Sequence, residues 1–281
     1  MLCCIGDLVE DIVVWPSSEP TRGTDTSSRI FRTRGGSAAT VAVHAAAVGV
    51  ATRFVGQVGN DPLGEALVRD LESAGVEVVV TRHGRTGSVV VLVDETGERT
   101  MLPDRGAATA LTELPVGALD GVSWLHVPAY SLVVEPLATT SITAVTRSRE
   151  LGATVSVDAS STGPLQHFGV DRFLDLLAQL GPDVFFCNRD EAATLGLGPD
   201  HGMAGMLTVR KSGADPVVIT DERGTVVTVP VPAVSDVADT TGAGDAFAAG
   251  FIAASMQGAT PAVAAEAGIG LAATVLTRPG G

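Results

Sequence analysis

The chain has 281 residues, 45% of them hydrophobic and only 4% aromatic, so it can bury a sizeable core built mainly from Ala, Val and Leu. Its formal net charge of −14 excludes the broad basic surface that nucleic-acid binding requires. No apolar run reaches the roughly 18 residues of a membrane span, and no basic leader precedes the first strand. We therefore expect a cytoplasmic protein without a membrane partner, with Cys3, Cys4 and Cys187 as reduced core thiols.

The N-terminal segment is predicted to start a sheet. Leu2 to Ile5 is an apolar run typical of a buried strand, and Ile12 to Trp15 is a second one. Asp11 stands between them, after the end of the first strand. A carboxylate at the end of a parallel strand lies where α/β sheets bind ligands. A solvated loop aspartate fits the same pattern, and the sequence leaves both interpretations open.

A glycine pair, Gly35-Gly36, precedes an alanine-rich helix predicted from Ala38 to Val48. Farther along, short apolar runs are separated by turns, which indicates hairpin strands. Together with Ile30 to Arg34 they are expected to form a small sheet, a lid built from about residues 12–34 and 77–103. The alternative is an edge hairpin without a moving role.

From Val122 onward, predicted strands and helices alternate without a linker or an internal repeat. The strands are expected at residues 124–127, 154–158, 184–187 and 217–220, and the main helices at 136–151 and 170–180. Alternation of this kind predicts a doubly wound, mostly parallel sheet with helices on both faces. We therefore predict one α/β domain over residues 1–281 that carries the small sheet.

Polar residues follow the predicted strand at 184–187. Asn188 and Glu191 are three residues apart at the start of a helix, so both side chains can face one ligand. The same spacing forms a capping box that only closes the helix N-terminus. The spacing alone is consistent with both a ligand-facing pair and a capping box.

The stretch Asp239-Thr-Thr-Gly-Ala-Gly-Asp-Ala-Phe247 carries the clearest chemical signal of the chain. Gly242, Ala243 and Gly244 form a turn that opens an alanine-rich helix, and the N–H groups of such a turn point where an anion would sit. Asp245 lies in the same turn, where a carboxylate is suited to take a proton from a hydroxyl that attacks a phosphate. The simpler alternative is an aspartate that only complements the helix dipole.

This stretch resembles the C-terminal signature of the ribokinase family of carbohydrate kinases, also called the PfkB family, and the resemblance extends over nearly the whole chain. It implies a ribokinase-like fold and ATP-dependent phosphorylation of a hydroxyl of a small sugar or sugar acid. Asp245 would be the catalytic base, and the amides of Gly242, Ala243 and Gly244 would surround the phosphoryl group. The alternatives are a nucleoside kinase and a catalytically silent relative with a binding or regulatory role.

The resemblance also implies cofactors, namely ATP with Mg²⁺ and, in many relatives, K⁺. The residues that it assigns to the nucleotide and Mg²⁺ are Asn188, Glu191, Thr220 and Gly224, and those that it assigns to K⁺ are Asp239 and Thr241. The loop from Thr220 to Gly224 is one residue shorter than the family pattern and lacks its middle glycine.

For the sugar, the resemblance assigns Asp11 to substrate hydroxyls and Gly35-Gly36 to the substrate turn. Thr40 stands where the family often has an asparagine, so the identity of the substrate is open at this position. Arg105 follows the hairpin and faces either an acidic substrate or solvent. The lid often forms the dimer contact in the family, which implies a possible homodimer.

Two stretches resemble other nucleotide-binding motifs but do not fit them. Gly268-Ile-Gly270 fits a loose dinucleotide fingerprint but follows no strand. Lys211-Ser212 resembles the end of a P-loop, but Arg210 stands where that motif needs glycine. The five histidines have no metal-ligand spacing.

Overall fold

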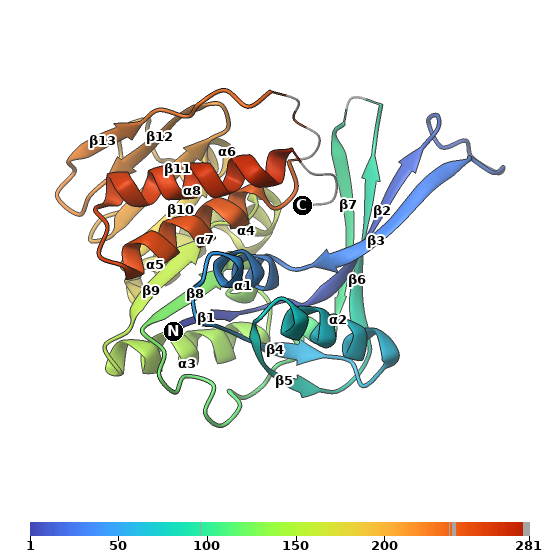
Figure 1. Ribbon diagram of the computed structural model, residues 1–281, viewed down its shortest axis with the longest axis horizontal. Helices are drawn as coiled ribbons and strands as arrows, with labels where there is room; N and C mark the ends of the chain where they lie inside the picture. Colours follow the sequence, from blue (N-terminus) through green and yellow to red (C-terminus); the bar gives the residue numbers. More distant parts are fainter. Residues whose placement is uncertain (96, 236, 238–239, 278–281) are drawn as a thin grey trace.

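A computed structural model describes residues 1–95, 97–235, 237 and 240–277 of the chain. Its strands form two sheets (Figure 1), one of nine strands in the order β13-β12-β11-β10-β9-β8-β1-β4-β5 and one of four in the order β3-β2-β6-β7. No helix among these residues is both long and apolar enough to cross a membrane.

The strands of the larger sheet are parallel from β5 to β11, whereas β12 and β13 run antiparallel to their neighbours. Their bounds are β1 (Leu2–Ile5), β4 (Thr52–Val58), β5 (Glu77–Arg82), β8 (Trp124–Pro128), β9 (Thr154–Asp158), β10 (Val184–Asn188), β11 (Leu207–Ser212), β12 (Asp215–Thr220) and β13 (Val226–Val229).

Helices cover both faces of this sheet (Figure 1). Their bounds are α1 (Ser37–Ala47), α2 (Pro62–Ser73), α3 (Leu137–Glu150), α4 (Thr162–Phe168), α5 (Val170–Leu180), α6 (Arg189–Thr194), α7 (Ala243–Met256) and α8 (Pro261–Leu276), with short 3₁₀ turns η1 (Ala107–Thr109) and η2 (Ala129–Ser131). The predicted doubly wound α/β fold is thereby confirmed.

The core lies in two layers because successive strand residues point to opposite faces. Phe186 and Cys4 pack beneath α1, α2, α7 and α8, while their neighbours Phe185 and Cys3 pack beneath α3 and α5. The three cysteines are buried free thiols, in agreement with the expectation from their spacing.

The four-stranded sheet comprises β2 (Val9–Pro16), β3 (Ser28–Gly35), β6 (Thr86–Val93) and β7 (Arg99–Gly106). It stands beside the larger sheet and faces the first turns of α1 and α7 (Figure 1). The prediction was wrong in one segment, because residues 77–82 form β5, which pairs in parallel with β4 at the edge of the larger sheet. Alternating apolar residues predict a strand but do not determine which sheet it joins.

The expectation of parallel alternation through residues 217–220 was also wrong. A strand that the sequence analysis missed, β11, precedes this segment, and only Gly213 and Ala214 separate it from β12. A two-residue connection reverses the chain, since a parallel crossover needs a dozen or more residues. The chain therefore runs in opposite directions in β11 and β12, with Thr220 paired to Thr208.

Candidate active site

The carboxyl ends of the parallel strands, the first turns of α1 and α7 and one face of the small sheet enclose a cleft of about 1120 Å³. Toward the small sheet it is lined by Asp11, Thr33 and Met101. Toward β12 and α8 its wall is aliphatic and includes Val217, Val231, Pro232, Ala233, Val234, Ile269 and Leu276. The edge of an open α/β sheet where parallel strands end is the usual place for a ligand.

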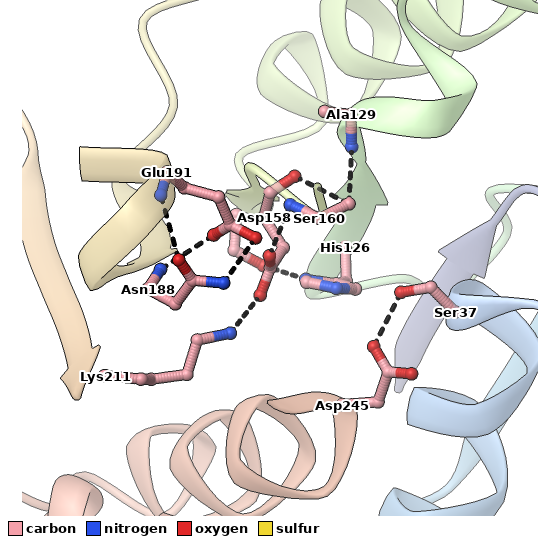
Figure 2. Close-up of polar contacts among 10 residues, drawn as sticks. Ser37, His126, Ala129, Asp158, Ser160, Asn188, Glu191, Lys211 and Asp245 are labelled. Atoms are coloured by element: carbon pink, nitrogen blue, oxygen red, sulfur yellow. Dashed lines mark hydrogen bonds and ion pairs between the residues drawn. The ribbon is translucent and has the colours of Figure 1, made fainter. Parts of the chain in front are cut away.

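Asp245 lies in the first turn of α7 and lines the cleft. The hydroxyl of Ser37, the first residue of α1, donates a hydrogen bond to its Oδ1 at 2.6 Å (Figure 2). Burial raises the pKa of Asp245 to about 7, although the bond from Ser37 acts in the opposite direction. A carboxylate with a pKa near neutrality can accept a proton and release it again at physiological pH.

The glycine turn before Asp245 has the conformation that its sequence predicts. Gly242 is the N-cap of α7 with φ of 73°, a left-handed conformation that side chains other than glycine rarely adopt. The amide of Ala243 donates to the carbonyl of Thr240 at 3.3 Å, so this amide already has a partner within the turn. The exposed Gly244 follows in the first helical turn, where N–H groups have no partner four residues back.

Lys211 and Asp158 form an ion pair in the cleft that the sequence analysis did not predict. Lys211 Nζ lies 2.7 Å from Asp158 Oδ2 (Figure 2), and both side chains line the cleft. Asp158 is the last residue of β9, and Lys211 is the second-last of β11. The available signal was the strand at 154–158, because its terminal carboxylate lies at the binding edge of the sheet.

Asn188 and Glu191 form the capping box that their spacing allows. The Asn188 side chain accepts from the Glu191 amide at 2.9 Å, and Glu191 accepts from the Asn188 amide at 2.7 Å. Both residues also line the cleft, and Figure 2 shows their side chains beside Asp158, so capping does not remove them from it. Burial, followed by the nearby charge of Asp158, raises the pKa of Glu191 to about 7.

The residues expected at the sugar lie together at the junction of β2, β3 and α1. Asp11 is half-buried, and burial raises its pKa to about 6. A Cβ at Gly35 would lie 2.1 Å from Asp11 Oδ1, so this glycine provides the space for the carboxylate. Gly36 is the N-cap of α1 with φ of 104°, and Thr40, one turn farther, lines the cleft beside Gly242.

Arg105 was expected to face either an acidic substrate or solvent, and the structure shows it in an ion pair instead. Its guanidinium forms a bidentate pair with Asp7, at 2.5 and 2.7 Å, and also donates to the Tyr130 carbonyl at 3.0 Å. Its side chain is 15% exposed and lines the cleft. The charge of Arg105 is thus compensated by Asp7, at the junction between the small sheet and the turn after β1.

Thr220 and Gly224 lie away from the cleft, contrary to expectation. Because β12 is antiparallel to β11, its end at Thr220 is paired with the beginning of β11, whereas Lys211, near the end of β11, lines the cleft. Gly224 belongs to the turn between β12 and β13. The segment that reaches the cleft is instead Lys211-Ser212-Gly213. For the cation site, Thr241 lines the cleft, and Asp239 lies outside the described residues.

Comparison with known sequences gives a match along the whole chain. Residues 1–281 match the model of the pfkB family of carbohydrate kinases. The chain is 32% identical over 267 residues to a fructokinase from Escherichia coli, an alignment that covers 88% of this chain and 82% of that protein. It is 34% identical over 227 residues to an ATP-dependent ribose-1-phosphate kinase from Halopiger xanaduensis, covering 78% and 72% of the two chains.

Solved structures share the fold. An adenosine kinase from Sinorhizobium meliloti superposes with a TM-score of 0.87 at 22% identity, covering 99% of this chain and 94% of that one. A sugar kinase from Pyrococcus horikoshii in complex with ATP superposes with a TM-score of 0.84 at 23% identity, covering 100% and 93% of the two chains.

Proposed function

Because the chain belongs to the pfkB family of carbohydrate kinases, we propose that its cleft transfers the γ-phosphoryl group of ATP to a hydroxyl of a small sugar or sugar acid. The observation that carries this proposal is the position of Asp245, a carboxylate with a pKa of about 7, in the first turn of the helix that the glycine turn opens. Proton acceptor and anion site are thereby adjacent, as phosphoryl transfer to a neutral hydroxyl requires.

In the proposed reaction, Asp245 accepts the proton of the sugar hydroxyl as its oxygen bonds to the γ-phosphorus. The bond between that phosphorus and the bridging oxygen of the β-phosphate breaks, and ADP leaves. Amides at the start of α7 stabilise the charge on the transferring group. Of the three amides expected to do so, that of Ala243 is engaged with Thr240, so Gly242 and Gly244 are the better candidates.

Asp11 is proposed to accept hydrogen bonds from the sugar, with Thr40 as a second polar contact. Both line the cleft, and Gly35-Gly36 brings the backbone close to them. Arg105, held by Asp7, is proposed to fix the base of the small sheet instead of binding an anion directly. The small sheet would then act as a lid over the sugar, and its outer face would bind a second copy of the chain.

Mg²⁺ is proposed to enter with ATP. The carboxylates of Asp158 and Glu191 and the amide of Asn188 are hard oxygen donors of the kind that Mg²⁺ prefers. The described residues contain no cluster of three or more His, Cys, Asp or Glu that could hold a metal by itself. This suits an ion that keeps phosphate and water ligands and neutralises phosphate charge. K⁺ near Thr241 remains a separate proposal, tested by comparing turnover in potassium and tetramethylammonium salts.

Formation of ADP with a panel of ketoses, aldoses, sugar acids and nucleosides tests the function. We expect turnover with at least one sugar or sugar acid, and we expect Asp245→Asn to reduce kcat by about 10²–10⁴-fold, the usual contribution of a general base. The Ser37 bond can persist because the asparagine Oδ1 also accepts. A folded Asn variant with wild-type kcat would exclude Asp245 as the base, and turnover with nucleosides alone would favour a nucleoside kinase.

A further inference from the structure

Lys211 is the only lysine in the sequence, and its amine lies inside the cleft. From β11 the side chain extends past the ring of Phe186, with Nζ 5.9 Å from the ring centroid, and reaches Asp158. The side chains of Lys211 and Asp158 are only 15% and 6% exposed. A long cationic side chain is therefore held in one place, instead of moving freely in solvent.

The amine lies beside the proposed anion site. Lys211 Nζ is 3.4 Å from the point where a Cβ of Gly244 would stand, which puts it against the first turn of α7. The ammonium and the helix N-terminus therefore face the same part of the cleft, and both favour an anion there.

We propose that the Lys211 ammonium contacts the γ-phosphoryl group during transfer and is a catalytic residue, an inference that rests on the function proposed above. An ammonium has three N–H donors. One points at Asp158, which fixes the amine, and another can bind a γ-phosphate oxygen. Charge-assisted bonds of this type are strong, and the stabilisation grows as charge develops on the transferring group.

The rival interpretation is a purely structural ion pair between β9 and β11. A buried pair is costly to break from one side, so removal of Lys211 would then lower stability. It would not, however, distinguish ATP from ADP. A contact to the γ-phosphate predicts instead that removal of Lys211 weakens the binding of ATP more than that of ADP, because only ATP carries that group.

The first test uses Lys211→Met, Lys211→Arg and, as a control, Arg189→Met. Arg189 also carries a positive charge near β10, but it is 62% exposed and pairs with Asp215 on the surface. We expect Lys211→Met to reduce kcat by about 10²–10³-fold, the usual loss on removing one such donor. It should weaken binding of a non-hydrolysable ATP analogue and leave ADP affinity within about twofold, and Lys211→Arg should retain more activity.

Equal loss of ADP and analogue affinity in Lys211→Met, or a kcat within a few-fold of the wild type, would overturn the inference. Failure of the proposed function looks different, because the wild-type chain itself would then turn over no sugar of the panel. The Arg189→Met control is expected to keep both affinities and kcat.

Chemical restoration of the amine tests the same point without depending on the fold of the Met variant. In Lys211→Cys, treatment with 2-bromoethylamine converts residue 211 into a thioether analogue of lysine. Burial raises the pKa of Cys3 and Cys187 to about 12 and also raises that of Cys4, so these thiols should not react. Recovery of at least tenfold in kcat at a single adduct, verified by mass spectrometry, supports the inference; complete modification without recovery refutes it.

Discussion

The pKa of the Asp245 carboxylate results from opposing influences. Burial raises the pKa to about 7, the hydroxyl of Ser37 lowers it, Asp158 and Asp11 raise it, and Lys211 lowers it. Because the folded pKa exceeds the ordinary 3.8, the group favours the folded state at low pH. That contribution to the free energy of unfolding is lost as the pH rises from about 4 toward 7.

Replacing Ser37 by alanine should shift the pH dependence of catalysis. Loss of the 2.6 Å bond removes an influence that lowers the pKa of Asp245, so the proton stays on the base to higher pH. We expect the acid limb of the kcat profile to move to higher pH, so that activity falls below that of the wild type at neutral pH and recovers at alkaline pH. Ser37→Thr, which keeps a hydroxyl, should resemble the wild type. An equal loss of kcat at every pH would mean that Ser37 does not act through this pKa.

The residues that carry the chemistry were predictable where the signal is local in sequence. Gly242 to Asp245 lie in one turn, and Asn188 and Glu191 in another, so spacing alone brought each group together. The pair of Lys211 and Asp158 joins residues 53 positions apart, and no periodicity relates them. Such a contact depends on which strands become neighbours in the sheet.

At the scale of elements, the pairing of β2 with β3 shapes the end of the cleft where the sugar is proposed to bind. Asp11 stands opposite Thr33 in the antiparallel register, and the space that a side chain at Gly35 would need is filled by the Asp11 carboxylate. A side chain at position 35 would therefore displace the Asp11 carboxylate, while residue 11 would remain an aspartate.

Gly35→Ala should displace the Asp11 carboxylate and raise the KM for the sugar. The loss of one charged hydrogen bond corresponds to roughly 1.5–3 kcal/mol, so an increase on the order of tenfold or more is expected. The KM for ATP should stay within twofold because we propose that the nucleotide binds at the other end of the cleft, against the aliphatic wall toward β12 and α8. A parallel increase in both KM values would indicate a general distortion.

Element directions were less predictable than element positions. The strand at residues 217–220 was expected from its apolar run, but its antiparallel direction follows from the short Gly213-Ala214 connection. The preceding strand, β11, contains Arg210 and Lys211, so it lacks the continuous apolar run of a buried parallel strand. Because β12 is antiparallel, its last residue, Thr220, lies at the end of the strands opposite the cleft.

For the molecule as a whole, the small sheet presents two different faces. Directly paired residues share a face, and the register therefore separates Asp11 from Ile12, Val14 and their partners. Ile30, 60% exposed, and Leu102, 53% exposed, lie on the face away from Asp11. Exposed apolar side chains on a sheet face are typical of a surface that another chain covers.

The proposed homodimer should therefore depend on this outer face. We expect the wild-type chain to have the mass of a dimer in light scattering, and Ile30→Asp with Leu102→Asp to have that of a monomer, because burying two carboxylates in an apolar contact is unfavourable. Val116→Asp, a fully exposed position elsewhere, serves as the control. A monomeric wild-type chain would contradict the proposed homodimer.

The aliphatic wall formed by Val217, the residues from Val231 to Val234, Ile269 and Leu276, where we propose that the purine binds, bears on which nucleotide the enzyme consumes. Apolar contact recognises the area of a purine ring and not the pattern of groups on its edge, whereas strong rejection of an analogue needs hydrogen bonds that it cannot make. We expect GTP and ITP to support turnover with kcat/KM less than about 10²-fold below that of ATP, as measured by sugar phosphate formation. A kinase with such a wall would couple sugar capture to whichever purine triphosphate is abundant, and so to the general energy state of the cell.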